Sequence, residues 1–268
     1  MDSKPNKDLL DLSGRVAIVT GAVGIGEAIS LRLAEAGASV VVASLTLEEA
    51  EGTVKKILEQ GGAATAVQTD VSDEESVKRM VEVAISKYSH IDILVNNAGI
   101  YPSIPVSKMS LDDFEKVLHV NLRGVFLCTK YASEHMIKAG KGGKIINITS
   151  IDALHPSSIG LAHYDASKHG VWGFTKNVAL ELAQHKIWVN AIAPGGIITP
   201  GVQKLQNSSP ASSETDMKKV MESFMAKIPM HRFGDPDDIG KVALFLASDM
   251  SSYMTGSQIV VDGGVLLS

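Results

Sequence analysis

Strand-like and helix-like patterns alternate along almost the whole chain, and this alternation limits the fold more than any other feature. The first strand-like run, Arg15–Thr20, is short, apolar and rich in β-branched residues. Such runs are typical of parallel strands that are covered on both faces. Similar runs, each separated from the next by a helical pattern, occupy residues 39–43, 64–68, 91–95, 144–148, 188–192 and 258–262.

Capping signals mark where the helices between these runs begin. A hydroxyl or carboxylate residue followed three positions later by an acidic residue is typical of a capping box. Alternating strands and helices imply a parallel sheet with right-handed crossovers. We therefore predict an α/β fold, a Rossmann-type doubly wound sandwich of about seven parallel strands with helices on both faces. The expected caps are Thr46 with Glu49, Ser72 with Glu75, Ser110 for a long helix to about Lys138, and Asp235.

The domain organisation is simple because no interdomain linker interrupts the alternation. Residues 1–11 are expected to form a flexible tail, and residues 12–268 a single domain. Residues 198–230 are the least regular stretch, polar at first and then carrying methionine and phenylalanine at helical spacing. We expect a mobile substrate lid there, and a disordered surface insertion is the alternative.

Charge and cysteine content exclude several classes of function. The net charge is −5, so a nucleic-acid partner, which requires a basic patch or stripe, is not expected. The sequence contains no apolar run of 18 residues, so no membrane-spanning helix is predicted. The polar N-terminus lacks the apolar core of a signal peptide, which favours a cytoplasmic location. Cys128 is the only cysteine, and no Cys/His cluster predicts a metal site.

A glycine-rich turn, Thr20–Gly26, follows the first strand and precedes a helix. Glycines allow a close approach of the backbone, and the helix N-terminus offers free N–H groups to a pyrophosphate. The order strand, glycine turn and helix therefore predicts a dinucleotide site.

Tyr164 and Lys168 are four residues apart, which places them on one face of a helix. An ammonium beside a phenol favours the phenolate, so we expect Lys168 to lower the pKa of Tyr164. Ser150 follows the strand 144–148, at the end where open α/β sheets place ligands. An isolated Tyr/Lys pair is more often a surface feature, and other motifs are needed to assign it.

Taken together, the motifs of residues 12–264 resemble the short-chain dehydrogenase/reductase family. The resemblance rests on the order in which the motifs occur along the chain. They are the glycine turn, Asp70, Asn97-Ala98-Gly99, Asn121, Ser150, Tyr164 with Lys168, and Pro194-Gly195 with Thr199.

The resemblance implies a catalytic set and a cofactor-binding set. Tyr164 would be the general acid or base, and Ser150 would polarise the substrate oxygen. Lys168 would lower the Tyr164 pKa and bind the nicotinamide ribose. Asn121 would support a proton relay through water. The cofactor-binding set is Gly21, Gly24, Ile25, Gly26, Ser44, Asp70, Val71, Asn97, Ala98, Gly99, Tyr164, Lys168, Pro194, Ile197 and Thr199.

Two departures from the family pattern lie at the adenosine end of the expected site. The glycine turn is one residue shorter than usual between Gly21 and Gly24. Where many NAD-dependent members carry an aspartate after the second strand, this chain has Ser44. Without a carboxylate at that position the cofactor is expected to be NADP or NAD, with a slight preference towards tolerance of NADP.

The substrate side is predicted less fully. Ser150 and Tyr164 should contact the substrate, and Asp152 and His155 should line the mouth of the pocket with Tyr101. His155 could bond a hydroxylated substrate or stabilise its own loop.

The predicted function is hydride transfer between a nicotinamide dinucleotide and a small carbonyl or secondary-alcohol substrate, as a carbonyl reductase or an alcohol or polyol dehydrogenase. A 3-oxoacyl-(acyl-carrier-protein) reductase is the alternative, although its acidic partner would need a basic patch such as Lys130, Lys138 and Lys141. A non-catalytic dinucleotide-binding protein is a further alternative. The resemblance also implies a homo-oligomer, either a dimer or a homotetramer, with no metal.

Overall fold

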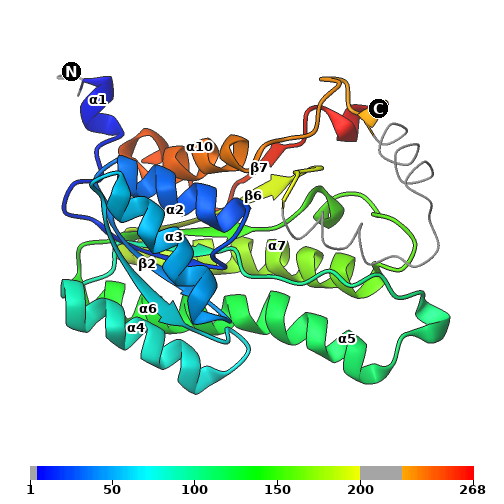
Figure 1. Ribbon diagram of the computed structural model, residues 1–268, viewed down its shortest axis with the longest axis horizontal. Helices are drawn as coiled ribbons and strands as arrows, with labels where there is room; N and C mark the ends of the chain where they lie inside the picture. Colours follow the sequence, from blue (N-terminus) through cyan, green and yellow to red (C-terminus); the bar gives the residue numbers. More distant parts are fainter. Residues whose placement is uncertain (1–4, 200–224) are drawn as a thin grey trace.

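A parallel sheet forms the centre of the molecule (Figure 1). The computed structural model describes residues 5–199 and 225–268. Its sheet has seven strands in the order β3-β2-β1-β4-β5-β6-β7, and every neighbouring pair is parallel. The predicted doubly wound α/β class is confirmed. The strands are β1 Val16–Thr20, β2 Ser39–Ser44, β3 Ala63–Gln68, β4 Ile93–Asn96, β5 Gly143–Ile148, β6 Ile187–Pro194 and β7 Gln258–Val261.

Helices cover both faces of the sheet, α2, α3 and α10 on one side and α4, α6 and α7 on the other (Figure 1). Alternate strand residues point to opposite faces, so Val19 joins the first core and Ile18 the second. All five residues of β1 are buried, as the continuous apolar run predicts. The helices are α2 Ile25–Glu35, α3 Leu47–Glu59, α4 Glu74–Tyr88, α5 Leu111–Leu118, α6 Gly124–Ala139, α7 Ala162–Leu182 and α10 Pro236–Ala247.

The strand order reverses direction between β1 and β4. From β1 the chain builds outward to β2 and β3, and from β4 it builds outward to β5, β6 and β7. At such a switch point the loops that follow the two strands separate and leave a crevice at their carboxyl ends. The glycine turn after β1 and the Asn97–Gly99 segment after β4 therefore flank one opening.

The long helix expected from Ser110 to about Lys138 is interrupted. Ser110 caps α5 through a complete capping box with Asp113, as an N-cap should. A π-helical turn, His119–Arg123, then separates α5 from α6. Such turns are rare and occur often at functional sites, and this one contains Asn121.

Two predicted capping boxes are wrong, whereas the expected helix start at Asp235 is confirmed, and Asp235 forms a capping box with Asp238. Thr46 occupies the N-cap position of α3 but its side chain bonds no helix N–H. At α4 the cap is Asp73, which accepts from the N–H groups of Glu75 and Ser76, instead of Ser72. Asp73 therefore occupies the N-cap position of α4 that the sequence pattern assigned to Ser72.

The expected N-terminal tail contains a short helix, α1 Asn6–Leu9. Most of the expected lid lies outside the described residues, which resume at Met225. Within the described part of the chain, no helix is long and apolar enough to cross a membrane.

Candidate active site

The glycine turn after β1 has a backbone that other residues would not fit. Gly21 and Gly24 have φ angles of +82° and +60°, a region that L-residues with a Cβ rarely adopt. A Cβ at Gly26, in the first turn of α2, would lie 1.7 Å from the carbonyl oxygen of Gly21. The turn therefore presses directly on the start of α2, whose first N–H groups have no partner within the helix. These features suit an anion held against the backbone.

Asn97 ties this turn to the end of β4. Its side-chain amide donates to the carbonyl oxygens of Thr20 at 2.9 Å and Gly21 at 3.3 Å. The backbone N–H groups of Asn97 and Ala98 both donate to the Thr20 hydroxyl, at 3.0 and 3.1 Å. Asn97 thus acts as a clamp across the switch point, and its amide is already occupied by protein partners.

A cleft of about 660 Å³ opens beside the turn. It passes from the glycine turn along the ends of β2 and β3 towards the Asn97–Gly99 segment and the start of α5. Its size, together with the glycine cradle, fits a dinucleotide. The predicted cofactor-binding residues that line it are Gly21, Ser44, Asp70, Val71, Ala98 and Gly99.

Ser44, at the end of β2, does not stand alone in this cleft. Its hydroxyl donates to the carboxylate of Glu49 at 2.8 Å, and both residues line the cleft. Sequence reasoning missed Glu49 as a site residue because its spacing to Thr46 predicted a capping box. The sequence signal that could have identified Glu49 is its position five residues after Ser44, across the short turn between β2 and α3.

Asp70 and Val71 shape the floor of the cleft after β3. Asp70 accepts from the backbone N–H and the hydroxyl of Ser72, at 2.8 and 2.7 Å, which fixes the turn. Val71 is buried against α6, where a Cβ on Gly124 would lie 2.9 Å from the Val71 side chain. The two residues therefore form a rigid part of the cleft wall.

Ser150, Tyr164 and Lys168 lie together at the end of β5, as predicted. Ser150 is buried, and its hydroxyl lies within hydrogen-bonding reach of the Tyr164 phenol. Lys168 is also buried, with Nζ 5.6 Å from the centre of the Tyr164 ring. Its ammonium donates to the carbonyl oxygen of Ile148 at 2.8 Å. A hydroxyl, a phenol and an ammonium therefore surround one position, where an oxygen could accept and exchange protons.

The expected fall in the Tyr164 pKa does not occur in the chain by itself. Burial raises the pKa of the phenol, the hydrogen bond from Ser150 opposes this, and the Asp152 carboxylate raises the pKa further. Burial also lowers the pKa of Lys168 to about 8. Spacing predicted the proximity of the two groups, but not that burial would dominate the pKa of the phenol.

Asn121 connects the π turn to this cluster. It is fully buried, and its amide exchanges two 2.8 Å hydrogen bonds with the backbone of Ile100 while donating to the Ser167 hydroxyl at 3.1 Å. Gly99 lies between Asn121 and Lys168, since a Cβ there would be 3.3 Å from Asn121 Oδ1 and 3.7 Å from Lys168 Nζ. The π turn therefore brings Asn121 close to Lys168.

The expected substrate residues are only partly brought together. Ser150 donates to the Asp152 carboxylate at 2.9 Å, and burial raises the pKa of Asp152. Tyr101 packs edge to face on Tyr164, with ring centres 6.0 Å apart. His155 is exposed, and its Nδ1 bonds the carbonyl oxygen of Pro156, which favours a role in its own loop.

The segment after β6 lies at the same edge of the sheet. Pro194 ends β6, and Ile197 and Ile198 are held by a backbone bridge to Gly234. The Ile197 side chain is buried in the core that covers α2, so only its backbone is available to a ligand. Thr199 is the last residue described before the gap.

Comparisons with known proteins agree with this geometry. The family profile described as Enoyl-(Acyl carrier protein) reductase matches residues 21–266. The 3-oxoacyl-(acyl-carrier-protein) reductase of Thermotoga maritima is 40% identical over 257 residues, covering 96% of this chain and 99% of that protein. A short-chain type dehydrogenase/reductase structure from Mycobacterium marinum superposes with a TM-score of 0.90 at 38% identity, covering 97% and 99% of the two chains. A putative 2-deoxy-D-gluconate 3-dehydrogenase from Agrobacterium tumefaciens, solved with bound NADP, gives a TM-score of 0.85 at 36% identity, covering 97% and 100%.

Proposed function

The chain belongs to the short-chain dehydrogenase/reductase family, and from that premise we propose that Ser150, Tyr164 and Lys168 manage the proton in its reaction. The protein is an NAD(P)-dependent oxidoreductase that acts on CH–OH groups. When bound, the dinucleotide supplies or accepts the hydride. What remains for the chain is to hold the substrate oxygen and to move one proton to or from it.

In carbonyl reduction, the Tyr164 phenol donates its proton to the substrate oxygen. Burial keeps the pKa of the phenol above its ordinary value, so the donor is fully protonated at neutral pH. Ser150 holds the same oxygen by turning its hydroxyl from the Asp152 carboxylate to the substrate. Lys168 supplies a positive charge beside the phenol. Asn121 holds the π turn against Ile100 and Ser167, next to Lys168. A chain of water molecules there could return a proton to Tyr164 after each turnover.

The cradle for the dinucleotide is proposed to be the glycine turn, the cleft behind it and the edge after β6. Gly21, Gly24, Ile25 and Gly26 would hold the pyrophosphate, and Asp70 with Val71 the adenine. The backbone of Pro194, Ile197 and Thr199 would border the nicotinamide. NADP tolerance, expected from the serine at position 44, is supported by the NADP-bound Agrobacterium structure. The Glu49 carboxylate beside Ser44 has the opposite effect, because its negative charge would repel the 2′-phosphate of NADP.

The substrate is proposed to be a small hydroxylated carbonyl compound or polyol. The observation that carries this proposal is the half-buried Asp152 carboxylate, 2.9 Å from the Ser150 hydroxyl. A substrate hydroxyl next to the reacting carbon would reach a strong acceptor there. Once the Ser150 hydroxyl turns to the substrate oxygen, a purely apolar substrate chain would leave this partly desolvated carboxylate without its hydrogen-bond donor.

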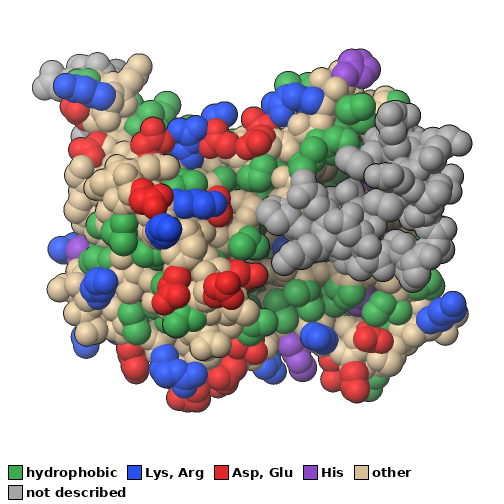
Figure 2. Space-filling model, in the orientation of Figure 1, with side chains coloured by type: hydrophobic (Ala, Val, Ile, Leu, Met, Phe, Trp, Pro, Cys, Tyr) green, Lys and Arg blue, Asp and Glu red, His purple; other side chains and the backbone are tan. Residues whose placement is uncertain are grey.

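A 3-oxoacyl-(acyl-carrier-protein) reductase is the second candidate, favoured by the Thermotoga relative. Its acidic partner would need a basic docking patch. Of the lysines expected to form one, Lys130 lies 3.9 Å from Glu74 and is partly neutralised. On the face drawn in Figure 2, acidic and basic side chains are interspersed over the described residues. The local charge thus gives this candidate little support.

A kinetic screen of Asp152→Asn beside the wild-type protein tests the substrate proposal. With polyols and hydroxyketones, the variant should lose about tenfold or more in kcat/KM, because an amide is a weaker acceptor than a carboxylate. Simple ketones that lack a second hydroxyl should change by less than about threefold. Equal losses on both classes, or a wild-type preference for acyl-pantetheine thioesters, would contradict a hydroxylated substrate.

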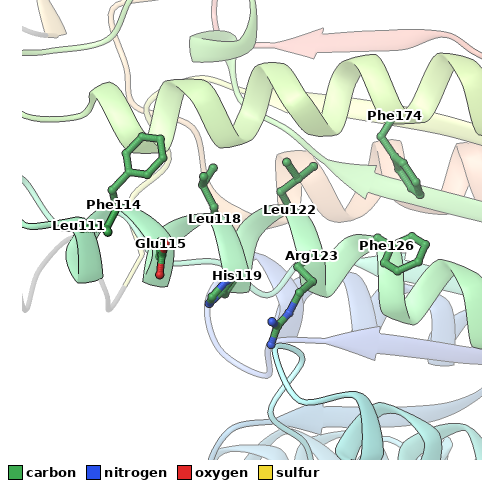
Figure 3. A pocket seen from close by; sticks show the side chains of 9 residues that line it. All are labelled: Leu111, Phe114, Glu115, Leu118, His119, Leu122, Arg123, Phe126 and Phe174. Atoms are coloured by element: carbon green, nitrogen blue, oxygen red, sulfur yellow. The ribbon is translucent and has the colours of Figure 1, made fainter.

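A homodimer or homotetramer is proposed from an apolar groove of about 600 Å³ on α5, α6 and α7 (Figure 3). Phe126 of α6 and Phe174 of α7 meet edge to face there, with ring centres 6.4 Å apart, and Phe126 remains 45% exposed. Grouped exposed apolar side chains of this kind mark interaction surfaces. A second copy is the proposed occupant. The groove is lined by Leu111, Phe114, Glu115, Leu118, His119, Leu122, Arg123, Phe126 and Phe174.

Phe126→Ser combined with Phe174→Ser should shift the protein towards monomer, as measured by light scattering on a sizing column. The change removes the two aromatic rings at one end of the groove (Figure 3), and large buried aromatic side chains contribute most to an interface. Leu180→Ser is the matched control, because Leu180 lies on the same helix α7 and is 79% exposed but does not line the groove. An unchanged oligomer in the double variant, or a monomeric wild type, would rule out this surface as the interface.

A further inference from the structure

We propose that Glu49 sets the cofactor preference of this enzyme and favours NAD(H) over NADP(H). The residue acts from α3, outside the position after β2 where the family pattern places an acidic group. The inference rests on the NAD(P)-dependent activity stated above and concerns the adenosine end of the same cleft.

The contact between Ser44 and Glu49 fixes where this negative charge lies. Ser44 Oγ donates to Glu49 Oε2 at 2.8 Å, and Ser44 is 6% exposed. Glu49 is half-buried and lines the cleft with Ser44 and the glycine turn residues Gly21, Ala22 and Val23. A carboxylate has about four acceptor positions, so the bond from Ser44 leaves capacity for another donor. Serine and glutamate together thus place a carboxylate at the end of β2.

The lysine of α3 that lies beside this part of the glycine turn, Lys56, already forms an ion pair within the protein. Lys56 lies 2.7 Å from Glu27 of α2. Glu27 is also bonded by Thr53, whose hydroxyl donates to the carbonyl oxygen of Ala22 in the glycine turn. Among the described residues that line the cleft, the basic groups are Lys116 and His119, which come from the α5 side. The Ser44 side of the cleft lining is therefore net negative.

This charge distribution distinguishes the two dinucleotides. The ribose 2′-hydroxyl of NAD(H) can donate to a carboxylate, whereas NADP(H) carries a phosphate monoester with a charge of about −1.5 to −2 there. Two negative groups in a partly desolvated cleft repel each other more than they would in water. Ser44 has a single hydroxyl proton, which it donates to Glu49, so it could donate to a phosphate only by breaking that bond. NADP(H) should therefore bind more weakly than NAD(H).

Glu49→Gln removes the charge and keeps the shape, and its amide oxygen can still accept from Ser44. We expect the Kd for NADPH, measured by calorimetry or quenching of protein fluorescence, to fall by about tenfold or more in this variant. The Kd for NADH should rise or stay within about threefold. Glu48→Gln is the matched control, because Glu48 is the neighbouring, exposed acidic residue in the first turn of α3. It should leave the ratio of the two Kd values unchanged.

Salt provides an independent readout of the cause. Between about 0.05 and 0.5 M salt, the disadvantage of NADPH should shrink in the wild type, since screening weakens charge repulsion, and change less in Glu49→Gln. A wild type that binds NADPH as tightly as NADH, or a Kd ratio unaffected by Glu49→Gln, would overturn the inference. Failure of the wild type to bind either dinucleotide would overturn the inference and also the assigned activity. Binding of both without turnover would contradict the activity alone.

Discussion

Replacing Tyr164 with phenylalanine should reduce kcat by about 10²–10⁴-fold while leaving the fold and dinucleotide binding nearly intact. The ring continues to pack on Tyr101, 6.0 Å away, so the loss is confined to one hydroxyl. That hydroxyl is the group that would give the substrate oxygen its proton. Steady-state kinetics together with a dinucleotide titration separate the two effects.

Tyr101→Phe is the control for this prediction, because it removes a hydroxyl from the neighbouring ring and should change kcat by less than about threefold. The pH dependence gives a second check. Since burial raises the pKa of Tyr164 and lowers that of Lys168 to about 8, wild-type carbonyl reduction should decline above about pH 8 as Lys168 loses its charge, while the phenol itself stays protonated. Substantial turnover in Tyr164→Phe, with the same alkaline limb, would transfer the proton role to another group.

The sequence predicted that Ser150, Tyr164 and Lys168 lie together, because local rules fix their positions. Tyr164 and Lys168 share a helix face through their four-residue spacing, and Ser150 follows a strand that is buried on both faces. The structure brings all three to one place, and parallel pairing of β4 and β5 carries Asn97 to the same edge. Periodicity and strand order were sufficient for these residues.

Properties that depend on tertiary packing could not be predicted from local pattern. Glu49 has capping-box spacing to Thr46, yet packing of α3 on the core turns its carboxylate towards Ser44. The direction of the Tyr164 pKa depends on how much protein surrounds the phenol, which spacing to Lys168 does not reveal. The π turn at Asn121 is stabilised by side-chain bonds to Ile100 and Ser167, which lie far away in sequence. In each case a partner outside the local pattern decided the outcome.

Gly26→Ala should nearly abolish dinucleotide binding, and the reason is steric. The new Cβ would lie 1.7 Å from the carbonyl oxygen of Gly21 and 2.6 Å from Asn97 Nδ2. These are the atoms of the clamp between the glycine turn and β4, so the turn must move to relieve the overlap. Because a pyrophosphate would depend on the position of that backbone, we expect the Kd for NADH and NADPH to rise by about 100-fold or more.

The same substitution elsewhere separates this effect from a general one. Gly52 lies within α3, and a Cβ added there would meet no atom within 4 Å, so Gly52→Ala should leave binding unchanged and stabilise the fold by up to about 1 kcal/mol. Thermal unfolding without ligand shows whether Gly26→Ala remains folded. It should unfold at a lower temperature, because overlap with backbone atoms costs about 1–3 kcal/mol. A folded Gly26→Ala protein that binds both dinucleotides as the wild type does would exclude this turn as the pyrophosphate site, since no arrangement of Gly21 and Asn97 relieves the overlap without displacing them.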